Sequence, residues 1–347
     1  MKPIHLAVGV AALALLLALP HFVYPVFLMK VLCFALFACA FNLLIGYVGL
    51  LSFGHAAYFG GGAYIAAHMI KVGTVYIPFV GTIAFPPVTP EIGILLGTLF
   101  AGILGFVFGS LAIRRQGIYF AMITLALAEM FFLFCVQAPF THNEDGIQAI
   151  PRTPLFGVID TTDETSLYYI VLVIFLIGFG IVYRTIHSPF GQVLKAIREN
   201  EPRAISLGYN VDRYKLLAFV ISCTLAGLAG ATKTFVFRLA SLTDVTWQMS
   251  GEVVLMTLLG GIGTIFGPIV GAGIIVSMQN YLATLGEWVL VIQGAIFVAC
   301  VMLFRRGVVG EVREYFRVRR AAAAAEAAGA AAQSAAAGAD RKPAPVA

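Results

Sequence analysis

Charged residues are scarce in this sequence. Asp, Glu, Lys and Arg make up 11% of its 347 residues, whereas they make up about 25% of an ordinary soluble domain. Hydrophobic residues reach 60%, which leaves little polar material to cover a water-facing surface. The composition therefore excludes a soluble enzyme or a soluble binding domain, and it predicts an integral membrane protein.

Cysteine pairs and catalytic motifs are also missing. The five cysteines lie singly inside apolar runs with no CxxC pair, so neither a disulfide framework nor a metal site is expected. The chain has no HExxH, no Ser/His/Asp set and no paired carboxylates, which argues against an intramembrane hydrolase. It also lacks GxxxxGK[ST], and no strand precedes GGIGTIFG, so we expect no ATPase activity and no cofactor of its own.

Long apolar runs dominate what is present. About 20 apolar residues form a helix that spans a hydrocarbon core about 30 Å thick. We therefore expect an all-α protein with about ten membrane helices, in a range of eight to ten. The first run could instead be a signal peptide that is removed. The runs are 6–19, 26–45, 53–70, 92–113, 118–139, 167–183, 216–237, 252–283 and 288–304.

The distribution of Lys and Arg predicts the orientation, because short cytoplasmic loops are enriched in these residues. A cytoplasmic N-terminus places 140–166, with five carboxylates and a lone Arg152, outside, and places 184–215 inside. The basic residues that follow 304 should also lie inside, which requires the run 252–283 to be split into two crossings. The basic residues of 184–215 are Arg184, Lys195, Arg198, Arg203, Arg213 and Lys215.

Two glycine-dense stretches interrupt the apolar runs, at 47–64 and at 260–273. Glycine-interrupted helices expose backbone groups at mid-membrane in many transporters. We therefore predict helix breaks near both stretches, while the alternative is that the glycines only allow helices to pack closely. The residues assigned to the breaks are Gly60, Gly61, Gly62, Gly260, Gly261, Gly263 and Pro268.

The cytoplasmic segment begins with a helix start signal. Ser188 can cap the helix and Pro189 suits its first position. An apolar stripe at helical spacing follows, and Pro202 predicts that this helix ends near Glu201. Such a stripe needs a partner, which could be the membrane surface or a groove on another protein. The stripe consists of Phe190, Val193, Leu194 and Ile197.

At this point the chain resembles a known family, the permease subunits of bacterial ABC importers for branched-chain amino acids, specifically the LivM-like members. The similarity runs from about residue 40 to 310 and depends on the order and spacing of several stretches. These are NLLIGYVGLLSFGHAAYFGGGAY (42–64), RRQGIYFAMITLALAEM (114–130), EDGIQAIPR (144–152), SPFGQVLKAIRENEPRAISLGYNVDRYKLLAFVISCTLAGLAGA (188–231), GGIGTIFGPIVGAG (260–273) and LFRRGVVG (303–310).

The resemblance implies an assembly. It implies a sister permease, two cytoplasmic ATP-binding subunits, a periplasmic solute-binding protein and a bacterial inner-membrane location, with no nucleic acid partner. It also implies that the segment 184–215 docks on the ATPase. In this segment Pro202 interrupts the family's coupling motif, and the outer loop has Thr141-His142-Asn143 where relatives commonly carry a Gly-Gly pair. The coupling candidates are Lys195, Arg198, Glu199, Asn200, Ala204 and Gly208.

Few residues are candidates for the solute path. Ser52, His55 and Tyr58 lie at the first break, although a lone membrane His is often a helix-to-helix hydrogen-bonding group. Glu129 lies roughly 16 Å into its helix, near mid-membrane, where an ionisable group is rare and by default functional. Lys233 and Arg238 fall near the outer surface, where snorkelling explains them.

These observations predict a transmembrane domain over 1–310 and a basic, then Ala-rich, cytoplasmic tail over 311–347 that we expect to be disordered. The expected function is that of a non-enzymatic permease subunit that carries leucine, isoleucine, valine or related amino acids inward. The alternatives are a urea or short-amide ABC permease and a proton-coupled carrier that uses Glu129. The exact solute, and whether the pore is a homodimer or a heterodimer, stay open.

Overall fold

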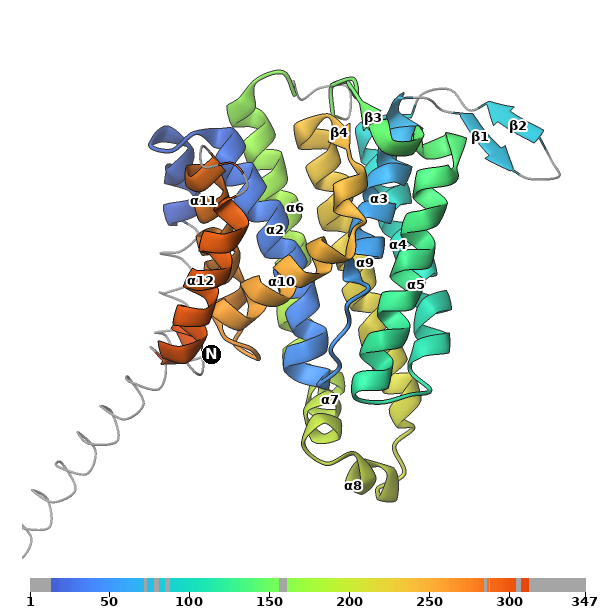
Figure 1. Ribbon diagram of the computed structural model, residues 1–347, viewed down its shortest axis with the longest axis vertical. Helices are drawn as coiled ribbons and strands as arrows, with labels where there is room; N and C mark the ends of the chain where they lie inside the picture. Colours follow the sequence, from blue (N-terminus) through green and yellow to red (C-terminus); the bar gives the residue numbers. More distant parts are fainter. Residues whose placement is uncertain are drawn as a thin grey trace, which may run out of the picture.

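The structure, a computed structural model, describes residues 14–71, 74–77, 81–84, 88–155, 161–283, 286, 288–303 and 307–311. Helices dominate this part of the chain, and the strands that it contains are short. Figure 1 shows the long helices side by side in one bundle. The predicted all-α fold is therefore confirmed.

The helices fall on the predicted apolar runs. Within the described residues, five are long and apolar enough to cross a membrane: Pro25–Val48 (α2 with a π-helical extension), α4 (Pro90–Ala112), α5 (Ile118–Gln137), α6 (Glu164–His187) and α9 (Val211–Phe237). Shorter apolar helices accompany them: α3 (His55–Lys71), α10 (Trp247–Gly260), α11 (Gly267–Leu282) and α12 (Trp288–Leu303). The first run, 6–19, lies mainly outside the described residues, so the total of ten crossings stays a prediction.

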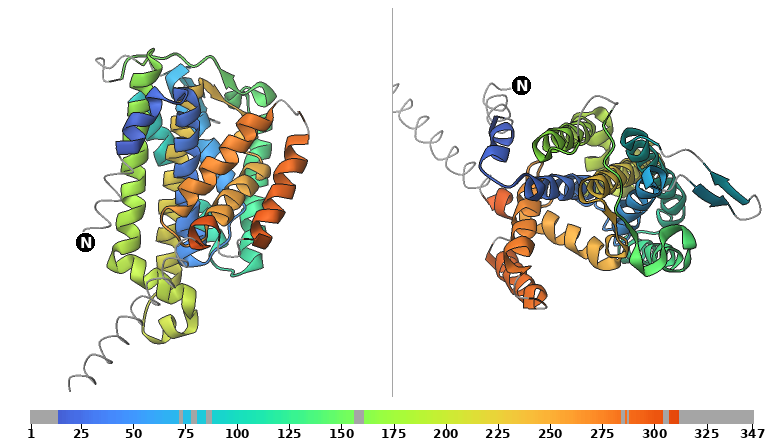
Figure 2. Two further views of the ribbon diagram at one scale, coloured as in Figure 1. Left: turned by 90° about the vertical axis from the view of Figure 1, so that its left-hand side faces the viewer. Right: turned by 90° about the horizontal axis from the view of Figure 1, so that it is seen from above.

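α2 (Pro25–Asn42) is the central helix. The apolar span that it begins is 89% buried, whereas that of α5 is 28% buried, as expected when one helix is apolar all round and enclosed by others. α2 contacts α6, α9, α10 and α11, while α9 also packs against α3 and α4. Seen from above, α11 and α12 lie at one edge of the bundle and α4 and α5 at another (Figure 2). The core is thus built around α2, α3 and α9.

The two ends of the bundle differ. One end carries the short helices α7 (Pro189–Glu199) and α8 (Glu201–Ser206). The opposite end carries two antiparallel strand pairs, β1 (Thr74–Ile77) with β2 (Gly81–Ala84) and β3 (Ile147–Gln148) with β4 (Leu239–Ala240). The basic segment 184–215 and the acidic loop that follows α5 therefore lie at opposite ends. Short turns of 3-10 helix complete the fold: η1 (Leu19–His21), η3 (Pro139–Thr141), η4 (Asn143–Asp145) and η5 (Leu242–Asp244).

The first predicted break is wrong in its position. Gly60, Gly61 and Gly62 lie inside the continuous helix α3, because their missing side chains serve packing. A Cβ atom on Gly62 would lie 2.8 Å from the Cα atom of Gly227 on α9, so these glycines bring the two helices into backbone contact. The break lies earlier, where α2 continues as the π-helix η2 (Leu43–Val48) and an irregular segment, 49–54, leads to α3.

The second predicted break is present. α10 ends at Gly260, and the segment 261–266 contains Gly261 and Gly263 with positive φ of 113° and 73°. α11 begins at Gly267, with Pro268 in its first turn, where the missing N–H costs nothing. The run 252–283 is therefore two helices, as the charge distribution requires. The tail prediction for 312–347 and residues 156–160 of the outer loop lie outside the described residues.

Candidate functional site

The predicted path residues of the first break lie together in the core. Ser52, His55 and Tyr58 are each at most 1% exposed. The Ser52 hydroxyl accepts a hydrogen bond from the Gly54 N–H at 3.3 Å and closes the turn before α3. Tyr58 packs edge-on against the rings of His55 and Phe219. Contact of these side chains with a solute stays a prediction.

His55 takes part in a helix-to-helix hydrogen-bond chain. Its Nε2 lies 2.8 Å from the Ser222 hydroxyl, and that hydroxyl donates to the Ala40 carbonyl at 2.6 Å. A hydroxyl has a single proton, so Nε2 is the donor to Ser222. The chain joins α3, α9 and α2. This geometry gives His55 a structural role whether or not it also meets a solute.

Glu129 lies on the peripheral helix α5. Its side chain is partly exposed, and within the described part of the chain no hydrogen bond or ion pair involves it. An ionisable group in this position is expensive unless it faces a polar partner or cavity. The proton-carrier role of Glu129 stays a prediction.

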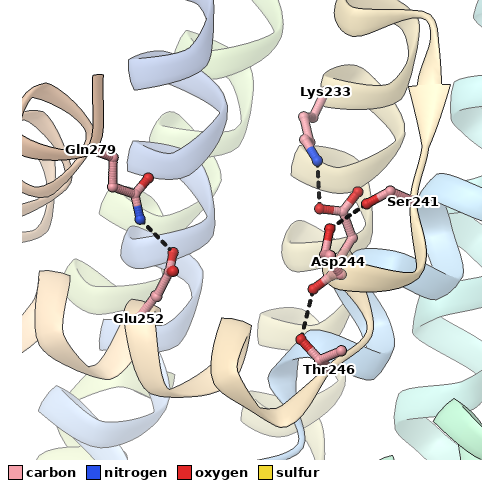
Figure 3. A network of polar contacts seen from close by, with 7 residues as sticks. Lys233, Ser241, Asp244, Thr246, Glu252 and Gln279 are labelled. Atoms are coloured by element: carbon pink, nitrogen blue, oxygen red, sulfur yellow. Dashed lines mark hydrogen bonds and ion pairs between the residues drawn. The ribbon is translucent and has the colours of Figure 1, made fainter. Parts of the chain in front are cut away.

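A buried ion pair between α9 and the segment after it overturns one expectation. Lys233 Nζ lies 2.5 Å from Asp244 Oδ1, and the two side chains are 14% and 1% exposed. Lys233 therefore binds an internal carboxylate and does not snorkel outward. The reason is that residues 241–246 turn back along α9, so that Asp244 faces it (Figure 3). Arg238, by contrast, is exposed, and its Nε donates to the Ile150 carbonyl at 2.8 Å.

A second polar contact links the helices of the later break. Gln279 Nε2 on α11 donates to Glu252 Oε2 on α10 at 2.9 Å (Figure 3). Asp244, Glu252 and Lys30 of α2 were not predicted as functional residues from the sequence. The signal that could have found Lys30 and Glu252 is the one used for Glu129, an ionisable residue inside a predicted span.

The segment between α6 and α9 folds as two capped helices. Ser188 accepts from the Gly191 N–H at 3.3 Å and caps α7, as predicted. Asn200 accepts from the Arg203 N–H at 3.1 Å and caps α8. Pro202 lies in the first turn of α8, where proline is tolerated. This segment therefore contains two short helices joined at Asn200.

The apolar stripe of α7 is covered by the chain itself. Leu194 and Ile197 are 0% and 2% exposed, and Phe190 stacks on Tyr214 of α9 with ring centroids 5.5 Å apart. Neither a membrane surface nor a foreign groove is needed to bury this stripe. The predicted coupling residue Ala204 is buried beside Ile197.

The exposed apolar surface of this end lies beyond α7. Ile205 and Leu207 are 57% and 69% exposed. Gly208 follows them, exposed, with a positive φ of 86°. Glu199 and Asn200 are also exposed. These residues present a small apolar and polar surface at the tip of the segment.

The two helix breaks meet beside α7. The Asn42 side chain donates to the Thr264 carbonyl at 2.8 Å and accepts from the Gly263 N–H at 2.9 Å. The Tyr47 hydroxyl donates to the Gly263 carbonyl at 3.0 Å. From α7, Arg198 donates to the Gly46 carbonyl, and the Lys195 ammonium lies 5.7 Å from the centre of the Tyr47 ring.

A cleft opens at this meeting point. Its volume is about 600 Å³, and its walls come from the end of α6, from α7 and from both breaks. It is the place where the predicted coupling residues and the predicted break residues come together, and it is separate from Ser52, His55 and Tyr58. The lining residues include Gly46, Tyr47, His187, Lys195, Arg198 and Gly263.

Comparison with known proteins agrees with the sequence patterns. The family described as the permease component of the branched-chain amino acid transport system matches residues 26–301. The chain is 26% identical over 311 residues to the high-affinity branched-chain amino acid transport system permease protein LivM of Escherichia coli, covering 82% of this chain and 69% of that protein. It is 28% identical over 264 residues to a probable branched-chain amino acid transport permease protein LivM of Methanocaldococcus jannaschii, covering 66% and 72%.

A shorter similarity extends to sugar permeases. The ribose import permease protein RbsC of Bacillus subtilis is 30% identical over 140 residues, covering 38% of this chain and 44% of that protein. No solved structure gives a significant match.

Proposed function

The chain belongs to the family of branched-chain amino acid transport permease components, and from this premise we propose that it is the membrane-spanning subunit of an ATP-driven importer. The solutes are leucine, isoleucine, valine or closely related amino acids. The chain is a multi-pass membrane protein, and we place it in the bacterial inner membrane. It forms the path and leaves ATP hydrolysis to other subunits.

The observation that carries the proposal is the meeting of α7 with both helix breaks. A permease driven by a partner ATPase needs a segment outside the membrane that is mechanically joined to the helices that line its path. The bonds from Arg198 to Gly46, and from Asn42 and Tyr47 to Gly263, join these parts. Irregular backbone at 49–54 and 261–266 provides the hinges.

The α7–α8 end is the surface that docks on one of the two ATP-binding subunits. Its tip exposes Ile205, Leu207 and Gly208, and its net basic charge supports a cytoplasmic location. The opposite end, which carries β3 and β4, then faces the periplasm and receives the solute-binding protein. A sister permease completes the pore.

The experiment that tests the proposal is uptake in proteoliposomes. The chain is co-reconstituted with its sister permease, ATPases and binding protein, and labelled leucine, urea and ribose are offered in parallel. Wild type is compared with Gly208→Asp. The matched control is Gly117→Asp between α4 and α5, which adds the same charge to an exposed glycine that also has a positive φ, of 63°.

ATP-dependent leucine uptake that falls in Gly208→Asp, and persists in Gly117→Asp, is the expected result. The reason is that Asp at a φ of 86° strains the backbone and puts a charge beside the exposed apolar tip. Uptake of urea or ribose in place of leucine would overturn the solute assignment. Uptake driven by a proton gradient without ATP would overturn the mechanism and direct attention to Glu129.

A further inference from the structure

Two segments that are far apart in the sequence, α7 and the loop between α10 and α11, converge on one short stretch of backbone, residues 46–47. The stretch lies in the π-helix η2 (Leu43–Val48). This convergence is not needed for the fold of any single element.

The contact between the two breaks is made backbone to backbone. A Cβ atom on Gly46 would lie 2.8 Å from the N atom of Gly263 and 2.9 Å from its Cα atom, so no side chain separates the two segments. Asn42 and Tyr47 then satisfy three polar groups of residues 263–264. Such groups are costly to leave unpaired away from water. The two breaks therefore move together or lose these bonds.

Arg198 adds α7 to this unit. The last carbonyls of a helix lack intrahelical donors and carry partial negative charge, which a cation stabilises. The Arg198 guanidinium meets the Gly46 carbonyl in this way. One turn earlier on α7, Lys195 lies over the Tyr47 ring at 5.7 Å, within the range of a cation–π contact. α7 thus contacts Gly46 and Tyr47, and both of these residues also contact Gly263.

The cleft of about 600 Å³ lies beside these contacts, and Lys195, Arg198 and Glu199 of α7 form part of its wall. At its other end, α7 is anchored to α6, because the Ser188 hydroxyl donates to the Thr185 carbonyl at 2.7 Å and caps α7 as well. A displacement of α7 at Asn200 would therefore shift Arg198. Through the Gly46 carbonyl, this shift would reach both breaks.

We propose that Arg198 is a positioning residue that transmits movement of α7 to both helix breaks at once, through the Gly46 carbonyl and the Asn42–Tyr47–Gly263 contacts. The proposal rests on the proposed importer function and specifies how its ATPase and its path are coupled. Without Arg198 the α7 helix still docks, but its movement no longer reaches the two hinges together.

The test compares Arg198→Gln and Tyr47→Phe with Arg115→Gln in the reconstituted complex. Arg115 is an exposed cation between α4 and α5, outside the segment 184–215, and its side chain makes no described hydrogen bond or ion pair. ATP hydrolysis and leucine uptake are measured in the same vesicles, and their ratio is the readout. A general folding defect lowers both rates together and leaves the ratio unchanged.

Arg198→Gln is expected to lower the leucine transported per ATP hydrolysed by about five- to tenfold or more, the scale of a typical coupling between sites. Tyr47→Phe should lower the ratio less, Arg198→Lys should restore part of it, and Arg115→Gln should leave it unchanged. An unchanged ratio in both Arg198→Gln and Tyr47→Phe would overturn the proposal. If the Arg198→Gln complex does not assemble, the ratio of leucine transported to ATP hydrolysed in Tyr47→Phe alone tests the proposal.

A second measurement separates this inference from the importer proposal. Hydrogen exchange of residues 43–54 and 260–266 is followed in the wild-type complex, with and without a trapped nucleotide. Exchange in both breaks should change on trapping in wild type and in Arg115→Gln, but not in Arg198→Gln. If the wild-type complex moves no leucine but its exchange still changes in both breaks on trapping, the assignment of leucine as solute is refuted and the coupling role of Arg198 is supported. An Arg198→Gln complex that responds like wild type would refute the coupling role.

Discussion

At the scale of single residues, the buried pair of Lys233 and Asp244 departs furthest from expectation. Two charges removed from water are costly unless each satisfies the other. The Asp244 carboxylate is 1% exposed and accepts from Lys233 at 2.5 Å, while the Phe59 ring lies 6.0 Å from the same ammonium. The pair fixes the segment 241–246 against α9 and α3.

Asp244→Asn should destabilise the protein, because it leaves the Lys233 ammonium buried without its counter-charge. Breaking a buried pair from one side typically costs about 3–5 kcal/mol. The expected result is a lower midpoint of thermal unfolding in detergent. Lys233→Met combined with Asp244→Asn should recover much of the loss. A double variant as unstable as Asp244→Asn would show that the charge imbalance is not the cause.

At the scale of elements, glycine has two uses that the sequence does not distinguish. In α3 it serves close packing, because Gly62 lies against Gly227 of α9 within a continuous helix. Between α10 and α11 it serves a break, because Gly261 and Gly263 take positive φ. Both uses follow from the absence of a Cβ atom, so composition alone predicts a glycine-rich region without deciding which use applies.

Gly62→Ala tests the packing role. The added Cβ atom would lie 2.8 Å from the Cα atom of Gly227, and relief requires α3 and α9 to move apart. Overpacking of this kind typically costs about 1–3 kcal/mol. The matched control is Gly180→Ala on α6, where a Cβ atom meets nothing within 4 Å and helix propensity favours Ala. The midpoint of thermal unfolding should therefore fall in Gly62→Ala and not in Gly180→Ala. Equal behaviour of the two variants would contradict the packing role.

At the scale of the whole molecule, the two ends of the bundle are chemically distinct. The α7–α8 end is basic, and the opposite end carries β3, β4 and the acidic loop. The proposed importer requires the basic end to meet ATPases inside the cell and the other end to meet a binding protein outside.

Site-directed labelling tests this orientation. Ser206→Cys and Asn143→Cys place a thiol on an exposed residue at each end, while Cys33, Cys39, Cys135 and Cys223 are buried. A membrane-impermeant thiol reagent added to spheroplasts should label Asn143→Cys at once, and Ser206→Cys only after permeabilisation. The unsubstituted chain measures the background. The reverse pattern would invert the topology and refute the proposed docking side.

Much of this architecture could be predicted from the sequence. Hydropathy and helical length are properties of contiguous residues, so the runs that became α2, α4, α5, α6 and α9 were predicted close to their observed bounds. The split of 252–283 followed from counting crossings between basic segments, and the Ser188 cap followed from local chemistry. Family membership could likewise be inferred from the order and spacing of short motifs.

Only the tertiary structure decided which distant groups meet. Asn42 and Gly263 are 221 residues apart in the chain, and no local period indicates that the Asn42 side chain bonds the backbone of both Gly263 and Thr264. The stripe of α7 looked unpartnered because its cover, Tyr214, lies on another helix. A local sequence pattern indicates the kind of environment that a residue needs, such as lipid, a protein core or a helix cap. The partner that supplies this environment depends on how the helices pack, and packing is set by contacts across the whole chain.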